Sequence, residues 1–358
     1  MKNFFVLLAV IMISCSSGEE KKLPFIRGVY GNPGALLDAG YRYDSLGMNS
    51  VFVRSVSFNR EFYENAREQG MKIFVEFPTL LGRDYLSSHP EAWPVNEKGE
   101  QAPPASWFMG ICPTDQDFWD YRVGQLEDIL RDFDVDGIFL DYVHWHAQFE
   151  TSDPILPETC FCDGCTGLFS KDKELDVQGG DIPEKATWIM ENADREWRDW
   201  RNSILNGWVS GMGEIVKDMR PEALLGIFYC SWYPEEHDSA LYRTLGIDVA
   251  AFARLADVLS PMLFHKMKEK EPSWAGEYIR WLDEHTGAGT KGKPLIWPIV
   301  QSHNNPQVVS PEEFREVMLE GSVYPGSGIM MFSDRSLLED PGKIEVMKDL
   351  YLNHPGFR

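Results

Sequence analysis

The sequence predicts a single (β/α)8 barrel, a TIM barrel, with long loops after strands three and four. Three observations support this prediction. Short apolar runs rich in Val, Ile and Phe recur eight times between residues 25 and 332, and near-continuous apolar runs are typical of parallel strands buried on both faces. Amphipathic stretches of helical character separate the runs. The chain of 358 residues has a length common for one such barrel, so a second domain is not required.

The predicted strands each follow an amphipathic stretch, often with a glycine just before the apolar run. In chain order they cover residues 25–30, 50–54, 72–77, 137–142, 224–230, 258–264, 294–300 and 328–332.

The predicted helices fill the gaps between these strands. One amphipathic helix is indicated by an apolar stripe at helical spacing. Gly47 and Gly70 stand where a C-cap glycine would release the chain into the next strand. Ser310, followed by Pro311 and two acids, predicts the start of another helix. The stripe consists of Phe118, Tyr121, Leu126, Ile129, Leu130 and Phe133.

Two connections are much longer than the others, about 78–117 after strand three and about 143–185 after strand four. In a barrel of this class the loops that follow the strands form the active-site face. Long structured loops within a compact domain are usually functional. We therefore expect the site at the C-terminal ends of the strands, beneath these two loops.

Four cysteines in these loops predict a structural zinc site. Cys112 lies in the first loop, and Cys160, Cys162 and Cys165 form a C-x-C-x-x-C cluster in the second. Four thiolates around zinc leave no open position for catalysis. A pair of disulfides is the alternative, because an exported protein can form them. Cys230, at the end of the fifth strand, is expected to be a small buried apolar residue, with a role in lining the pocket as the alternative.

The N-terminus predicts a bacterial lipoprotein signal over residues 1–15, in which Cys15 becomes the lipidated first residue. An ordinary secretory signal is the alternative. Residues 16–22 are then a polar tether, and residues 23–358 a single catalytic domain. The acidic residues of the tether indicate the outer membrane or the cell surface, with the periplasmic face as the other location. Membrane contact is expected only through the lipid anchor.

Composition limits the partners that the protein can bind. The net charge of −22 argues against nucleic acid and against an anionic membrane surface, because both would repel the chain. Aromatic residues make up 13% of the chain, which suits either a large aromatic core or a cleft that stacks on sugar rings. Composition alone does not separate these two interpretations.

Two carboxylic acids are the candidate catalytic groups. Asp141 follows four apolar residues at the end of the fourth strand, where a side chain of a barrel reaches the substrate pocket. Its alternative role is to cap the next loop or to pair with Arg54. Glu76 ends the third strand, and alternation along that strand leaves open whether it faces the pocket or the helices.

Polar and aromatic residues at or just after the strand ends are the candidate substrate contacts, and Trp297 adds another ring there. Hydrogen-bonding groups mixed with aromatic rings suit a polyhydroxylated ligand, such as an oligosaccharide or a polysaccharide. The candidates are Arg54, Tyr142, His144, Trp145, Trp232, His265, Gln301 and Asp334.

Several motifs between residues 51 and 169 resemble those of the hypothetical glycosyl hydrolase group of barrel proteins. They are His89-Pro-Glu-Ala-Trp93, Asn96-Glu-Lys-Gly99, Cys112-Pro, the stretch from Asp134 to Asp141, and Cys160-Phe-Cys-x-x-Cys165. The spacing of the four cysteines is similar to the structural zinc site of family 42 β-galactosidases. The resemblance implies a glycoside hydrolase barrel with structural zinc at Cys112, Cys160, Cys162 and Cys165.

The chain departs from family 42 at its catalytic positions. That family has an Asn-Glu pair at the end of strand four and a glutamate on strand seven, whereas this chain has Asp141 and no acid in residues 296–302. A strand-four aspartate is similar to the nucleophile of retaining α-glycosidase barrels. We therefore expect an exported glycoside hydrolase that uses Asp141 and a second carboxylate, with Glu76 as the partner. A non-catalytic glycan-binding lipoprotein on the same barrel is the alternative. A hydrolase with catalytic zinc is a weaker one, because all four expected ligands are thiolates.

Overall fold

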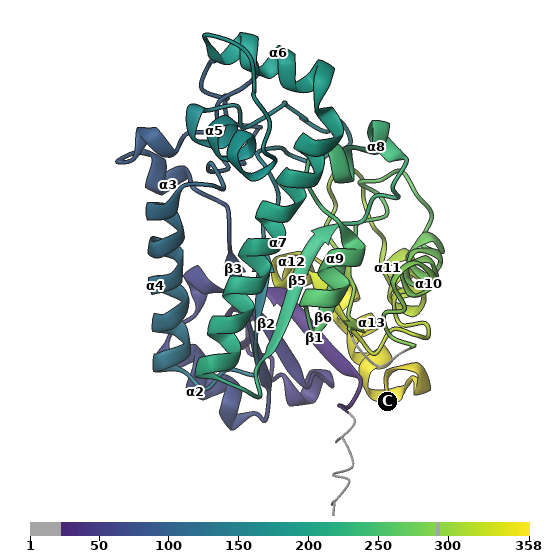
Figure 1. Cartoon of the computed structure of the whole chain (residues 1–358). Helices are drawn as coiled ribbons and strands as arrows, with labels where there is room; N and C mark the ends of the chain where they lie inside the picture. Colours follow the sequence, from purple (N-terminus) through teal and green to yellow (C-terminus); the bar gives the residue numbers. More distant parts are fainter. Residues whose placement is uncertain (1–22, 291–293) are drawn as a thin grey trace, which may run out of the picture.

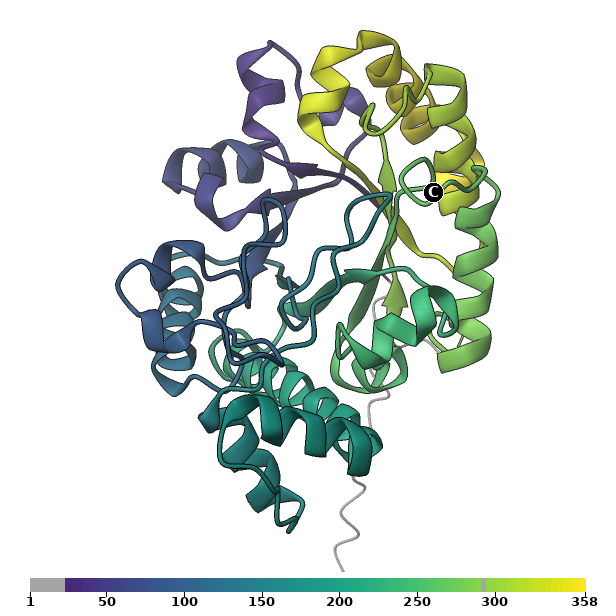
Figure 2. The same ribbon diagram turned by 90° about the horizontal axis from the view of Figure 1, so that it is seen from above.

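A computed structural model of the chain describes residues 23–290 and 294–358. The parallel strands close into a barrel with helices around it (Figures 1 and 2). Neighbouring strands follow the order β5-β4-β3-β2-β1-β9-β8-β6, and pairing of β5 with β6 closes the ring. The predicted (β/α)8 barrel is confirmed. The predicted signal, Cys15 and the tether at 16–22 lie outside the described residues.

All eight predicted runs form strands, and their outer ends shift by no more than one residue. The strands are β1 (Ile26–Gly31), β2 (Ser50–Arg54), β3 (Lys72–Pro78), β4 (Gly137–Asp141), β5 (Leu224–Cys230), β6 (Val258–Leu263), β7 (Leu295–Ile296), β8 (Ile299–Gln301) and β9 (Gly328–Phe332).

The seventh predicted strand is interrupted and forms β7 and β8. Both pieces pair with β6, so together they occupy one position in the barrel. The interruption falls at Trp297 and Pro298, because proline has no amide hydrogen to give to the ladder. The carbonyl of Pro298 still accepts a hydrogen bond from Met330 N at 3.1 Å, which keeps the two pieces beside β9.

The helices lie outside the barrel or within its connecting loops. No helix in the part of the chain that the structure describes is long and apolar enough to cross a bilayer. The α-helices are α1 (Gly34–Asp38), α2 (Arg60–Glu68), α3 (Arg83–Leu86), α4 (Gln116–Asp132), α5 (Asp163–Asp172), α6 (Ile182–Asn192), α7 (Asp194–Met219), α8 (Glu236–Arg243), α9 (Val249–Leu255), α10 (Trp274–Thr286), α11 (Pro311–Gly321), α12 (Asp334–Glu339) and α13 (Pro341–Asn353). Short 3-10 turns cover η1 (Asp44–Leu46), η2 (Ser55–Ser57), η3 (Pro90–Ala92) and η4 (Pro355–Phe357).

The local signals of the sequence explain where several of these helices begin and end. Helix α4 covers the predicted stripe except Phe133, its C-cap residue, and Tyr121 is 44% exposed instead of buried. The side chain of Ser310 caps α11 by accepting a hydrogen bond from Glu313 N at 3.2 Å. Gly47 ends η1 in the left-handed region at φ 74°, the conformation that favours glycine.

Four aromatic rings fill the interior of the barrel and form what we call the aromatic floor: Phe52, Phe74, Phe139 and Trp297. The centroids of Phe52 and Phe74 lie 4.8 Å apart, and those of Phe74 and Trp297 lie 5.3 Å apart. Gly226 makes room for this layer, since a Cβ there would lie 2.4 Å from the Phe139 ring. Trp297 was expected at the barrel mouth and lies in this floor instead.

The two long loops leave the C-terminal ends of β3 and β4. The first covers residues 79–115 and includes α3, and the second covers residues 142–193 and includes α5 and α6. Figure 1 shows α5 and α6 beyond the end of the barrel to which the β5 arrow points. The second loop reaches the start of α7, further than the sequence predicts, because α6 belongs to the loop and not to the outer ring.

Candidate active site

Three charged side chains stand at the ends of three neighbouring strands. Arg54 ends β2 and pairs in register with Glu76 of β3, while Asp141 ends β4 opposite Pro78. Glu76 comes two residues after Phe74 of the aromatic floor, so strand alternation directs it into the barrel and not towards the helices. The exposed fractions of Glu76 and Asp141 are only 4% and 3%. The two carboxyl groups therefore form one layer directly above the floor.

A cavity of about 920 Å³ opens above this layer, and both carboxylates line it. Five of the residues that the sequence predicts for catalysis or substrate binding are brought together in its wall. They come from the ends of β2, β3 and β4 and from the start of α12. These five are Arg54, Glu76, Asp141, Tyr142 and Asp334.

The two carboxylates are electrostatically linked. Burial raises the pKa of Glu76 to about 7, and the nearby Arg54 guanidinium partly opposes that rise. Burial, and then the charge of Glu76, raise the pKa of Asp141. Asp141 Oδ1 accepts a hydrogen bond from Tyr142 N at 2.8 Å, which favours the anion. A carboxyl group with a pKa near 7, as for Glu76, can exchange protons near neutral pH, as acid–base catalysis requires.

We expect Glu76→Gln to stabilise the protein more strongly as pH rises. The folded pKa of about 7 lies above the ordinary 4.5, so the favourable contribution of Glu76 is present below pH 4.5 and is lost as pH rises through 7. At 1.36 kcal/mol per pKa unit, the loss reaches about 3 kcal/mol. Glutamine does not ionise in this pH range, so the variant does not undergo this loss of stability. Urea unfolding at pH 5 and pH 8 measures the difference. Glu345→Gln, exposed on α13, is the control, and an advantage that does not grow with pH contradicts the expectation.

Several residues that sequence reasoning missed also line the cavity. Glu150 belongs to the loop after β4, and Trp107, 45% exposed, belongs to the loop after β3. Tyr30 is the last residue but one of β1. An acid that directly follows an aromatic residue in the long fourth loop was the available signal for Glu150. Because Glu150 lies in a loop well beyond the end of β4, strand alternation could not predict where its side chain points.

The other five predicted contacts do not line the cavity, because their side chains pack behind its wall. His144 Nδ1 lies 2.8 Å from the carbonyl of Trp145. Trp145 is fully buried and donates from Nε1 to the carbonyl of Arg201 at 3.2 Å. The Arg201 guanidinium stacks 4.7 Å from the centre of the Trp145 ring. These contacts hold the loop after β4 against α7.

The remaining three support neighbouring loops in the same way. Trp232 lies under the ammonium group of Lys268, with 4.6 Å between Nζ and the ring centre. His265 Nε2 lies 3.1 Å from Glu313 Oε1. Gln301 is fully buried, and its Nε2 donates to the carbonyls of His303 and Asn305 at 3.1 and 2.9 Å. Gln301 thus shapes the loop that carries His303.

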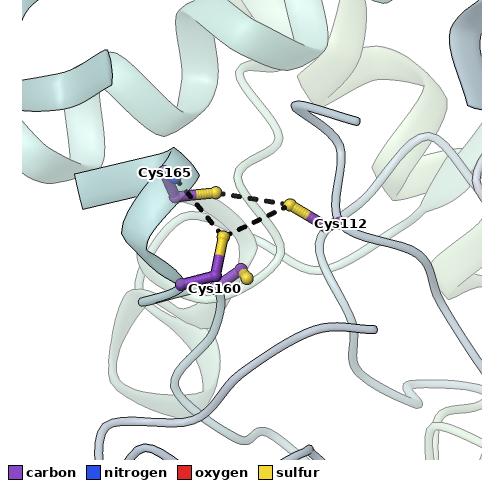
Figure 3. Close-up of side chains that lie close together, drawn as sticks. Cys112, Cys160 and Cys165 are labelled. Atoms are coloured by element: carbon purple, nitrogen blue, oxygen red, sulfur yellow. Dashed lines mark hydrogen bonds between the residues drawn. The ribbon is translucent and has the colours of Figure 1, made fainter. Parts of the chain in front are cut away.

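The four cysteines of the two long loops meet in one cluster, as predicted. Their sulfur atoms all lie within 4.8 Å of one another, and the sulfurs of Cys112, Cys160 and Cys165 point toward one another (Figure 3). Cys112 Sγ lies 3.8 Å from Cys162 Sγ and 3.5 Å from Cys165 Sγ. All four are free thiols and not disulfides, since a disulfide needs about 2.05 Å. The structure therefore does not contain the alternative pair of disulfides.

The donor set fits a tetrahedral metal ion. With zinc–sulfur bonds of about 2.3 Å, a tetrahedron has sulfur–sulfur edges of about 3.8 Å. Backbone amides support the sulfurs, because Val95 N donates to Cys160 Sγ at 3.2 Å and Cys165 N donates to Cys162 Sγ at 3.4 Å. Burial raises the pKa of Cys160 and of Cys165, and a bound cation would offset that cost. Four thiolates leave no position for substrate.

The barrel is similar to solved glycoside hydrolase structures. The glycoside hydrolase domain of PgaB (BpsB) from Bordetella bronchiseptica superposes with a TM-score of 0.64 at 13% identity, covering 92% of this chain and 99% of that one. The β-galactosidase from Rahnella sp. R3 gives 0.64 at 13% identity, covering 92% and 56%. The β-galactosidase from Halorubrum lacusprofundi gives 0.63 at 12% identity, covering 91% and 58%.

At these identities the likeness is one of fold. The chain spans nearly the whole PgaB domain but little more than half the length of the two β-galactosidases. No protein-family model and no curated protein sequence matches the chain.

Proposed function

We propose that the protein is an exported glycoside hydrolase that cleaves O-glycosidic bonds of an oligosaccharide or a polysaccharide. The observation that carries this proposal is the pair of buried carboxyl groups, Glu76 and Asp141, in one cavity at the C-terminal end of the barrel. Glycoside hydrolysis uses one carboxyl group as nucleophile or base and another as acid. Asp141 is the proposed nucleophile, and Glu76 is the partner that the sequence predicts.

The wall of the cavity suits a sugar. A volume of about 920 Å³ falls within the range of small-molecule sites, about 300–1,000 Å³. Arg54 and Asp334 offer a charged donor and a charged acceptor for hydroxyl groups. The ring centroids of Tyr142 and Trp107 lie 5.9 Å apart. Trp107 is exposed, so its ring provides an apolar surface for the face of a sugar ring.

The non-catalytic alternative, a glycan-binding lipoprotein, would keep the aromatic mouth and lose the second carboxylate. The cavity keeps Glu76 beside Asp141 and adds Glu150. Two more carboxyl groups beside the first favour hydrolysis over binding alone.

Hydrolysis of a glycoside panel by the full-length protein tests the proposal. The panel contains both anomers, because a strand-four aspartate resembles that of retaining α-glycosidases while two similar structures are β-galactosidases. We expect release of sugar from at least one glycoside, with the anomeric configuration of the first product read by NMR. Binding of glycans without any cleavage would favour the alternative instead.

We also propose that the four-cysteine cluster holds zinc in a structural role. Cys112 would tie the loop after β3 to Cys160, Cys162 and Cys165 in the loop after β4. When bound, zinc would supply a fixed tetrahedral cross-link between these loops and no catalytic water. The loops also carry Trp107 and Glu150, so the cross-link would support the cavity wall.

The proposed location rests on residues 1–22 of the sequence, which predict a lipid-anchored protein of the outer membrane or cell surface, the periplasmic face included. We expect Cys15→Ala to move the protein from the membrane fraction to the soluble fraction, since a thioether-linked lipid needs the thiol. Mass spectrometry of the N-terminal peptide should show the acyl groups on Cys15. An unmodified Cys15, or cleavage after a different residue, would support the ordinary secretory signal.

A further inference from the structure

One carboxyl group of the cavity differs from the others in its bonding. Five carboxylates line the cavity. Four of them accept hydrogen bonds: Glu76 from the backbone of Ser55, Asp141 from Tyr142 N, Asp334 from Asn32 N, and Glu339 from Arg335 Nε. Within residues 23–290 and 294–358, no hydrogen bond or ion pair reaches the carboxyl group of Glu150. A donor on a carboxylate favours the anion, and Glu150 alone among the five lacks that support.

The position of Glu150 is nevertheless fixed. Its backbone N donates to Gln148 Oε1 at 2.6 Å. Gln148 and Ile155 exchange two backbone hydrogen bonds of 2.9 Å, which close the loop around it. The carbonyl of Phe149 accepts a hydrogen bond from Lys268 Nζ at 3.4 Å. A rigid loop of this kind can present one side chain at a constant position, as a proton donor requires.

Glu150 is also more accessible than the other candidate for the acid. It is half-buried in the cavity wall, whereas Glu76 is only 4% exposed at the bottom. The titratable groups that interact electrostatically with Glu150 are Lys268, Arg54, Asp141, the Tyr142 hydroxyl and the Cys230 thiol. Burial raises the pKa of Glu150 to about 7, and Lys268 and Arg54 partly oppose the rise.

We propose that Glu150 is the general acid of the glycosidase reaction and that Glu76 is a positioning residue for Arg54. This inference rests on the proposed function and replaces the partner that the sequence predicts. Glu76 fits the positioning role because it lies opposite Arg54 in the strand register and beneath the open part of the cavity.

The proposed reaction is balanced with these two residues and water. The bond between the anomeric carbon and the glycosidic oxygen breaks, its electron pair stays on that oxygen, and the Glu150 proton moves to it, so the leaving sugar departs as an alcohol. An Asp141 oxygen forms a new bond to the anomeric carbon. Water then attacks the same carbon, gives one proton to the Glu150 carboxylate and releases Asp141.

Leaving-group dependence tests the assignment, with the dinitrophenyl and methyl glycosides of a sugar that the full-length protein cleaves. A dinitrophenolate departs without a proton, whereas methanol needs one. We expect Glu150→Gln to slow methyl glycoside hydrolysis by about 10²–10⁴-fold, the usual size of general acid catalysis. The value of kcat/KM for the dinitrophenyl glycoside, which reports only the first step, should fall much less, and the alkaline limb of the pH profile of kcat/KM for the methyl glycoside should disappear. Glu150→Ala with azide should yield a glycosyl azide.

Asp153→Asn is the matched control, because it removes an exposed carboxylate from the same loop. It should behave as the unchanged protein with both substrates. The proposal is overturned if Glu76→Gln shows the leaving-group split and Glu150→Gln does not, or if Glu150→Gln lowers kcat/KM equally for both substrates. Full activity of Glu150→Gln would overturn it too. If the unchanged protein cleaves no glycoside at all, the proposed function itself fails, a result distinct from these.

Discussion

Asp141→Asn is expected to lower kcat by about 10³-fold or more on every glycoside that the protein cleaves, whatever the leaving group. The amide cannot form the bond to the anomeric carbon that the carboxylate forms. The fold should survive, because asparagine has nearly the same volume and because burial already disfavours the charge of Asp141. Initial rates and the unfolding midpoint, measured on the same preparation, check both parts.

Asp134→Asn is the matched control for this variant. Asp134 precedes β4 at the opposite end of the barrel, where it is exposed and 4.0 Å from Arg220 Nε. An exposed pair of this kind contributes about 1 kcal/mol or less, so the rate and the midpoint should hardly change. Asp141→Asn with normal turnover would show that other carboxylates of the cavity carry the chemistry. A variant that loses glycan binding along with cleavage would point to a binding role for Asp141.

Cys165→Ser is expected to abolish the proposed metal binding and to destabilise the protein by several kcal/mol. The unchanged protein should carry about one zinc per chain by elemental analysis, since the four sulfurs lie within 4.8 Å of one another. Without the ion, three thiols, two of them buried, would face one another and the two long loops would lose their cross-link. The value of kcat/KM should also fall when the cross-link is lost, because these loops carry Trp107 and Glu150. Chelation should reproduce both effects.

Cys230→Ala separates the metal from the general effect of losing a cysteine. Cys230 is fully buried at the end of β5 and lies outside the cluster. Its replacement should cost about 1 kcal/mol, as for a small core truncation, and should leave the metal content unchanged. A Cys165→Ser protein that keeps its full metal content and stability would exclude the proposed zinc site.

The strands could be predicted from the sequence because each one carries its own signal. Runs buried on both faces are apolar throughout, and their ends are correct to within one residue. The interruption at Pro298 also has a local cause, the missing amide hydrogen. By contrast, nothing local showed that Tyr121 would be exposed. That outcome depends on what the neighbouring loop covers, which is a property of the tertiary structure.

The same distinction explains which site residues could be predicted. Arg54, Glu76 and Asp141 are strand residues, so position in the barrel follows from alternation once one neighbour is known to face inward. Trp145 comes after a strand end, where no register applies, and packs on Arg201. Gln301 ends β8, but its amide is occupied by two carbonyls of the following loop. The grouping of the four cysteines could be predicted because three of them lie within six residues of one another in the chain.

The aromatic floor closes the cavity at its lower end, so the cavity has no exit through the barrel. Phe52, Phe74, Phe139 and Trp297 close the barrel beneath the carboxylates, and ring centroids of Phe139 and Trp297 lie 6.0 Å apart with an interplanar angle of 17°. A glycan chain therefore cannot thread through the barrel, and the fragment held deepest must leave through the opening by which it arrived. That fragment blocks the next molecule until it departs, so the sugar released from the bottom should act as a competitive inhibitor.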